Sequence, residues 1–307
     1  MKMILIIMAL LFSISARSQT EEIVIVETEF GTLEGTLTIA SEEKAHPVVL
    51  LIAGSGPSDR DGNSPMLALN YLKLLSEGFV ENGISTLRYD KRGSGKSMGT
   101  AIDTMTFEIF VNDAELFKNE LVKDKRFSSV TVMGHSQGSL IGMLISKEGV
   151  DKYISSAGTG QAIQHILEDQ LNAQSPFLGR AATPILEKLS EGETVDSIPS
   201  LLQSLFNYNN QPFLISWMKY DPAVIITELT IPTLILQGTT DIQVSMEEAR
   251  MLIEACSCDS LIIDGMNHLL KRADADREKN LATYYDPELP LHEDLMEGII
   301  KFIRREE

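Results

Sequence analysis

The chain has 307 residues, 43% of them hydrophobic, and a formal net charge of −18. A chain of this length and apolar content can bury a large core, and a single α/β domain of this size is ordinary. The negative charge argues against nucleic acid or an anionic membrane surface as a partner, because either would be repelled.

The N-terminus predicts a secretory signal peptide at residues 1–18. Lys2 precedes the apolar run 3–12, and the small residues Ala16 and Ser18 occupy the places expected before a cleavage point. The apolar run is too short to span a bilayer by itself. We therefore expect a periplasmic or secreted protein that has no membrane contact after cleavage, with an uncleaved interfacial anchor as the alternative.

The elements that follow predict a mostly parallel sheet. Two runs of alternating hydrophobicity flank Phe30 and Gly31 and indicate an antiparallel hairpin. After them, short buried runs typical of strands alternate with amphipathic runs typical of helices. Such alternation is typical of an α/β protein with helices on both faces of the sheet. The expected strands are 23–29, 33–39, 47–53, 84–88, 130–133, 231–237 and 260–263, and the clearest helices are 66–82 and 106–122.

Residues 134–138, Gly-His-Ser-Gln-Gly, lie between an expected strand and a helix-like run. This context is typical of a nucleophile elbow, in which Ser136 sits on a strained strand-to-helix turn and the flanking glycines avoid clashes. The alternative is an ordinary turn with a serine N-cap. In an elbow, the backbone N–H of Gln137 would be one donor of an oxyanion hole.

Two later loops offer an acid and a base. Asp241 follows the strand 231–237, and His268 follows the strand 260–263. Asp264 is a second candidate acid, but its Asp-Gly pair is more typical of a turn. The order serine, aspartate, histidine is the one expected of α/β-hydrolases.

With these residues in place, the sequence resembles the α/β-hydrolase superfamily over nearly all of the chain after residue 20. Residues 87–97 are similar to the loop after the fourth strand in many bacterial members. Residues 54–62 are similar to the loop after the third strand in a bacterial esterase subgroup often labelled serine-aminopeptidase-like. The resemblance implies an α/β-hydrolase fold with a triad of Ser136, Asp241 and His268.

The resemblance also implies where the second oxyanion donor lies. Ser55 takes the place of the residue after the usual His-Gly pair, so its backbone N–H is the expected donor, with Gly56 next. Ala53 stands where many members have histidine. This difference at position 53 should leave oxyanion stabilisation intact, because the donor is a backbone N–H group.

Residues 158–230 are helix-like and contain no convincing strand, which predicts a helical cap inserted after the sixth core strand. The two parts of the core are then 19–157 and 231–307; a separate domain is the alternative. Caps of this kind cover the sheet edge where ligands bind. Most apolar cap residues should form its own core, and the candidates for lining a pocket are Leu201, Leu202, Leu205, Phe206, Phe213, Ile215, Trp217 and Met218.

The remaining polar candidates have simpler interpretations. Cys256 and Cys258 are free or locally paired thiols without a catalytic role. Asp59, Arg60 and Asp61 either pair internally and hold their loop, which we prefer, or bind a polar substrate group. No pattern predicts a metal site, a phosphate loop or a dinucleotide cofactor.

The sequence therefore favours a serine hydrolase that cleaves small-molecule carboxylic esters of small or medium acyl groups through an acyl-enzyme intermediate. One alternative is an aminopeptidase of the proline-iminopeptidase type. Those enzymes resemble one another in a His-Gly-Gly-Pro-Gly loop, where this chain has Ala-Gly-Ser-Gly-Pro at 53–57. The other alternative is a non-catalytic binding protein with a hydrolase fold. Nothing in the sequence predicts the oligomeric state.

Overall fold

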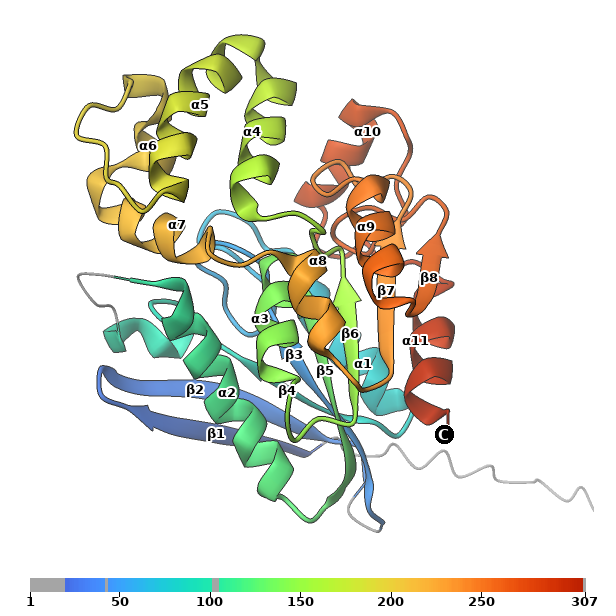
Figure 1. Ribbon diagram of the computed structural model, residues 1–307. Helices are drawn as coiled ribbons and strands as arrows, with labels where there is room; N and C mark the ends of the chain where they lie inside the picture. Colours follow the sequence, from blue (N-terminus) through green and yellow to red (C-terminus); the bar gives the residue numbers. More distant parts are fainter. Residues whose placement is uncertain (1–19, 42–43, 101–104, 306–307) are drawn as a thin grey trace, which may run out of the picture.

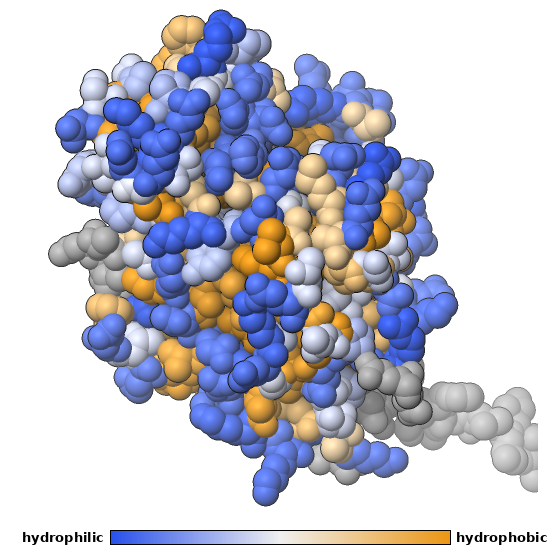
Figure 2. Space-filling model, in the orientation of Figure 1, coloured by the Kyte–Doolittle hydropathy of each residue, from blue (hydrophilic) through white to orange (hydrophobic). Residues whose placement is uncertain are grey.

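The computed structural model describes residues 20–41, 44–100 and 105–305. The expected signal peptide lies outside the described residues. Figure 1 shows a twisted sheet with helices on both faces and a group of helices above one edge. Figure 2 shows hydrophilic residues over most of one face, with hydrophobic residues visible in its middle and lower parts, below that group.

The sheet has eight strands in the order β1-β2-β4-β3-β5-β6-β7-β8. β1 and β2 form the expected antiparallel hairpin, β2 is antiparallel to β4, and the later neighbours pair in parallel. The predicted fold class is thereby confirmed. The strands are β1 (Thr20–Thr28), β2 (Gly31–Ile39), β3 (His46–Ile52), β4 (Ser85–Tyr89), β5 (Phe127–His135), β6 (Lys152–Ser156), β7 (Thr233–Gly238) and β8 (Asp259–Ile263).

The alternation of side chains along the central strands builds two cores, one on each face of the sheet. Val48, Leu50 and Ile52 of β3 pack with α2 and α3, whereas Val49 and Leu51 pack with α1 and α11. Figure 1 shows the helices that cover the two faces of the sheet. The core helices are α1 (Tyr71–Glu81), α2 (Phe107–Lys123), α3 (Gln137–Ile145), α8 (Pro222–Ile225), α9 (Met246–Cys256), α10 (Arg277–Ala282) and α11 (Leu295–Arg304).

Helix α1 begins at Tyr71, five residues later than the sequence predicts. The side chain of Asn63 accepts hydrogen bonds from the backbone N–H groups of Leu69 (2.7 Å) and Asn70 (2.9 Å). Asn70 itself has a left-handed backbone conformation, with φ of 55°. These local contacts compete with helical hydrogen bonds and delay the first turn.

The segment between β6 and β7, all of it described, contains helices and turns but no strand. Its apolar residues form a separate cluster that includes Leu202, Phe206 and Met218, so these three belong to the cap's own core. Leu201, also offered as a pocket residue, is 69% exposed. The cap helices are α4 (Ile163–Gln174), α5 (Pro176–Ser190), α6 (Gln203–Phe206) and α7 (Gln211–Trp217).

Helix α8 was expected within the cap, and it packs instead in the helix layer of the core. Ile225 and the adjoining Ile226 belong to the same hydrophobic cluster as α3 and α9. The physical reason is the crossover between the parallel strands β6 and β7, which needs a helix against the sheet. Short 3₁₀ segments occur at Gly95–Thr100, Ser200–Leu202, Tyr208–Asn210, Ile226–Glu228 and Thr283–Tyr285.

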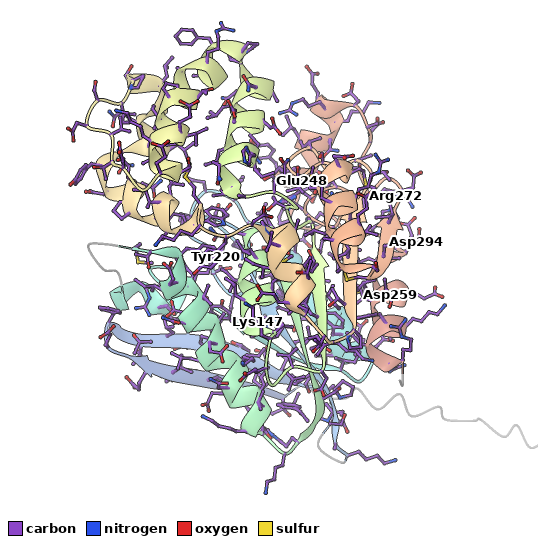
Figure 3. The ribbon with its side chains drawn as sticks, in the orientation of Figure 1. Lys147, Tyr220, Glu248, Asp259, Arg272 and Asp294 are labelled. Atoms are coloured by element: carbon purple, nitrogen blue, oxygen red, sulfur yellow. A yellow bond between two sulfur atoms is a disulfide. The ribbon has the colours of Figure 1, made fainter. Side chains whose placement is uncertain are left out.

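The cap is fastened to the core at its base. Glu248 of α9, labelled in Figure 3, accepts hydrogen bonds from the backbone N–H groups of Gly160 (2.8 Å) and Gln161 (3.1 Å). On the other side, the Ser216 hydroxyl of α7 accepts the N–H of Phe107 at 2.7 Å. These contacts fix the cap against α9 and α2.

Cys256 and Cys258 are joined by a disulfide between the end of α9 and the start of β8. No helix within 20–41, 44–100 and 105–305 combines the length and hydrophobicity that a bilayer crossing requires.

Candidate active site

Ser136 occupies the turn between β5 and α3, with φ of 54° and ψ of −119°. The two glycines of the motif make this turn possible. A Cβ on Gly134 would lie 2.0 Å from the Gly138 carbonyl oxygen, and a Cβ on Gly138 would lie 2.4 Å from the Ile52 carbonyl oxygen. The turn therefore has the strained, closely packed geometry that the sequence predicts for an elbow.

His268 and Asp241 are in direct contact. His268 Nδ1 lies 2.8 Å from Asp241 Oδ2, and their side chains are 5% and 1% exposed. Burial alone would raise the pKa of Asp241, but the facing His268 and the backbone N–H groups of Val244 and Gln243 hold that pKa below its ordinary value. An ionised Asp241 only accepts hydrogen bonds, so Nδ1 carries the proton and Nε2 is left free to act as a base.

Asp264 has a different environment. Its Oδ1 accepts a hydrogen bond from the Thr239 hydroxyl at 2.8 Å, at the exposed end of β8. The contact with His268 belongs to Asp241.

Ser136 and His268 line the same cavity, which has a volume of 170 Å³. The exposed Ser55 and the buried Tyr71 also form its wall. The four residues come from the segments after β3, β5 and β8 and from the start of α1. The carboxyl ends of three parallel strands thus supply the cavity, as expected for a ligand site in an open α/β sheet.

His135 and Tyr71 support this arrangement, and neither was identified from the sequence as a supporting residue. His135 Nε2 donates a hydrogen bond to the backbone oxygen of His268 at 2.8 Å. Burial lowers the pKa of His135 to about 3, so its ring is neutral. The ring centroid of His135 lies 4.7 Å from that of Tyr71 and 4.7 Å from that of His268. A histidine within the motif therefore braces the loop of the candidate base.

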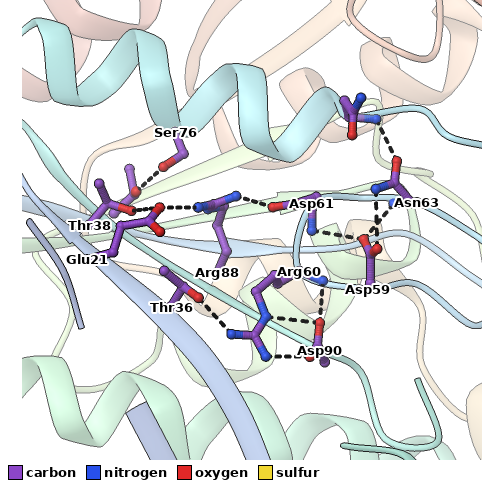
Figure 4. Close-up of polar contacts among 12 residues, drawn as sticks. Glu21, Thr36, Thr38, Asp59, Arg60, Asp61, Asn63, Ser76, Arg88 and Asp90 are labelled. Atoms are coloured by element: carbon purple, nitrogen blue, oxygen red, sulfur yellow. Dashed lines mark hydrogen bonds and ion pairs between the residues drawn. The ribbon is translucent and has the colours of Figure 1, made fainter. Parts of the chain in front are cut away.

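The charged residues after β3 form ion pairs within the protein, as Figure 4 shows. Arg60 donates to both carboxylate oxygens of Asp90, at 3.1 and 2.5 Å, and to Glu34 at 2.7 Å. Asp61 pairs with Arg88. Asp59 Oδ1 accepts the backbone N–H of Asp61 at 3.0 Å. These contacts agree with the preferred interpretation, in which Asp59, Arg60 and Asp61 hold their loop.

A second cavity of 270 Å³ borders the same segments one or two residues further on. Gln137 and Pro57 contribute to its wall, together with Lys91 and Phe110. Of the eight apolar cap residues proposed as pocket-lining, Phe213 is the one that reaches this cavity. Its wall is mainly apolar, so it is suited to a hydrophobic ligand group.

Within the described residues, no group of three His, Cys, Asp or Glu side chains is arranged to hold a metal ion.

A serine on a strained turn, followed along the chain by an aspartate and a histidine in contact at the same sheet edge, is the arrangement of an α/β hydrolase. Residues 68–225 match the family described as serine aminopeptidase, S33. Because the match spans just over half of the chain, the protein belongs to this family.

Similar proteins include esterases. The chain is 26% identical over 254 residues to Esterase EstD of Thermotoga maritima, with 78% of this chain and 58% of the relative covered. It therefore spans less than two thirds of that relative's length.

Two solved structures share the fold. The Pyrococcus furiosus esterase Pf2001 has a TM-score of 0.62 at 15% identity, covering 94% of this chain and 91% of that one. Est1E of Butyrivibrio proteoclasticus, solved with ferulic acid bound, has a TM-score of 0.60 at 17% identity, covering 92% and 100%.

Proposed function

We propose that the protein is a serine hydrolase that cleaves carboxylic esters of small or medium acyl groups through an acyl-enzyme intermediate. Ser136 is the nucleophile, His268 the base and Asp241 the acid that orients it. The observation that carries this proposal is the 2.8 Å contact between His268 and Asp241 beside a cavity that Ser136 lines. The similarity to Esterase EstD supports the choice of ester chemistry.

The reaction follows from these positions. His268 Nε2 takes the hydroxyl proton as Ser136 Oγ bonds to the acyl carbon, and the carbonyl oxygen becomes an oxyanion. When this intermediate collapses, the bond to the alkoxy oxygen breaks and the alcohol leaves with the proton from His268. A water molecule, deprotonated by His268, then attacks the acyl-enzyme and releases the carboxylic acid and free Ser136. Asp241 keeps Nδ1 protonated and stabilises the imidazolium.

The oxyanion donors in this proposal are the backbone N–H groups of Gln137 and Ser55. Gln137 is the first residue of α3, where N–H groups have no acceptor within the helix. Among the described residues, none accepts a hydrogen bond from the Ser55 N–H. Both donors are therefore available to a ligand oxygen.

The family description favours a second candidate, an aminopeptidase. Such an enzyme must hold a substrate ammonium group, and a buried ammonium needs a carboxylate partner. In the described part of the chain, no Asp or Glu lines either the cavity of Ser136 or the cavity beside Gln137. This favours neutral acyl groups over aminoacyl groups.

The test compares Ser136→Ala with Ser64→Ala, a control that removes another hydroxyl from the same cavity. We expect Ser136→Ala to lose ester hydrolysis by several powers of ten and to lose fluorophosphonate labelling, while Ser64→Ala keeps both. Substrates are p-nitrophenyl esters of graded chain length and aminoacyl-arylamides.

Faster turnover of the arylamides would replace this proposal by the peptidase. Folded wild-type protein that neither turns over any of these substrates nor reacts with the probe would favour the non-catalytic binding protein.

A further inference from the structure

Lys91 is a buried basic residue close to the candidate oxyanion hole. It lies just after β4, is 3% exposed, and lines the cavity beside Gln137. Its Nζ donates hydrogen bonds to the Gly54 carbonyl oxygen at 2.8 Å and to Gln137 Oε1 at 2.9 Å. Nζ also lies 4.8 Å from the ring centroid of Phe110. None of the described Asp or Glu side chains forms an ion pair with it.

The contact with Gly54 bears directly on an oxyanion donor. The Gly54 carbonyl and the Ser55 N–H belong to one peptide unit, which is planar and trans, so the two groups point in opposite directions. A donor fixed on the carbonyl oxygen therefore also fixes the direction of the N–H. Glycine at position 54 leaves this peptide free to rotate unless something holds it.

Two side chains hold the peptides on either side of the Gly54 Cα. The Gly54 N–H donates to the Tyr71 hydroxyl at 3.4 Å, and the Gly54 carbonyl accepts from Lys91. A hydrogen bond to a carbonyl also polarises its peptide and strengthens the N–H as a donor. Lys91 also contacts the residue that supplies the second oxyanion donor, because its Nζ donates to the side chain of Gln137.

We propose that Lys91 is a positioning residue of the oxyanion hole, which holds the Gly54–Ser55 peptide and the Gln137 side chain so that the N–H groups of Ser55 and Gln137 converge on the acyl oxygen. This inference rests on the proposed esterase function. Its effect falls mainly on the transition state, because negative charge develops on that oxygen only during the reaction.

Burial lowers the pKa of Lys91 to about 7. The amine and the ammonium both have enough hydrogens to make two donations. The two contacts therefore persist in either protonation state.

The experiment measures kcat and KM for p-nitrophenyl butyrate in Lys91→Met. Removing an oxyanion donor outright costs on the order of 10²–10³ in kcat, and we expect the loss of its support to cost about 10-fold or more, with KM within about twofold. Fluorophosphonate labelling should slow in parallel, because its adduct uses the same hole.

Lys118→Met is the matched control. Lys118 is 4% exposed and donates to the backbone carbonyls of Ile145 (3.3 Å) and Glu148 (3.1 Å). Neither contact involves a residue that supplies a proposed oxyanion donor. We expect this variant to lose stability while its kcat stays within about twofold of wild type.

Two further variants keep the inference testable if Lys91→Met does not fold. Lys91→Gln keeps a neutral donor, so its kcat should fall below that of the wild type, but by less than the about 10-fold expected when the donor is lost. Gln137→Met keeps the backbone N–H but removes one acceptor of Lys91, and combining it with Lys91→Gln should cost less than the sum of the two single losses.

The inference is overturned if folded Lys91→Met keeps wild-type kcat, or if Lys118→Met loses as much. Failure of wild-type ester turnover would instead refute the proposed function, so the two failures are distinguishable.

Discussion

Asp241 and Asp264 follow adjacent strands, and they have different hydrogen-bond partners, His268 for Asp241 and Thr239 for Asp264. We expect Asp241→Asn to preserve the geometry but favour the wrong tautomer of His268, with a loss on the order of 10⁴ in kcat by analogy with serine proteases. Asp264→Asn removes a contact with Thr239 and should leave kcat within about twofold. Steady-state kinetics on one p-nitrophenyl ester decides between them. A larger loss in Asp264→Asn would transfer the role of the acid to that residue.

The residues proposed for the chemistry could be found from the sequence because each follows a recognisable strand. Lys91 could not be found in this way. A lysine within a charged loop is normally solvated. Its burial arises only when the segment after β3 and the start of α3, which are distant in the sequence, close around it. The supporting role of Tyr71 depends on the same long-range packing.

At the scale of an element, the turn between β5 and α3 depends on the absence of a side chain at Gly138. We expect Gly138→Ala to push α3 away from β3, because the new Cβ would lie 2.4 Å from the Ile52 carbonyl oxygen. Overpacking of this kind costs about 1–3 kcal/mol, and activity should fall with it.

Gly192→Ala is the control for Gly138→Ala. Gly192 has φ of +86° but no atom within 4 Å of an added Cβ, so this variant tests backbone strain alone. Strain at a positive φ costs on the order of 1 kcal/mol. Unfolding in urea measures the loss in the free energy of unfolding for each of the two variants. Equal stability and full activity in Gly138→Ala would contradict the packing argument.

Helix boundaries and the division of the cap show where local patterns lose information. The apolar spacing from residue 66 onward is typical of a helix. The helix begins only at Tyr71, because the Asn63 side chain accepts hydrogen bonds from the two backbone N–H groups just before it. In the cap, Phe206 faces the cap's own core and Phe213 faces a cavity. Both are aromatic residues in short helices, and the periodicity of such helices does not reveal which surface meets another part of the chain.

At the scale of the whole molecule, the net charge of −18 should affect which esters reach the site. We expect kcat/KM for 4-carboxyphenyl acetate to rise as NaCl increases from about 10 to about 150 mM, because the Debye length shrinks from about 30 Å to about 8 Å and repulsion is screened. Phenyl acetate, the neutral matched substrate, should show no such rise. Equal salt responses of the two esters would show that the overall charge does not reach the active site.

The overall architecture was the most predictable property of the chain. The alternating strand and helix patterns predict the parallel sheet. Because another strand follows near residue 233, the helices before it are predicted to be an insertion between two strands of one sheet. The assignment of α8 to the core could not be read in advance, because its four residues look like any other cap helix. Only the geometry of the crossover places it against α3 and α9.

The cap leaves and rejoins the core at neighbouring points, since the N–H of Ala223 donates to the carbonyl of Gly160 at 3.2 Å. A segment with adjacent ends and its own hydrophobic cluster can be exchanged without altering the order of the strands. In evolutionary terms, descendants of a common ancestor can acquire new substrate preferences by replacing the cap, while the α/β core beneath it is inherited unchanged. For the engineer, the junction between Gly160 and Ala223 marks the place to graft a foreign cap.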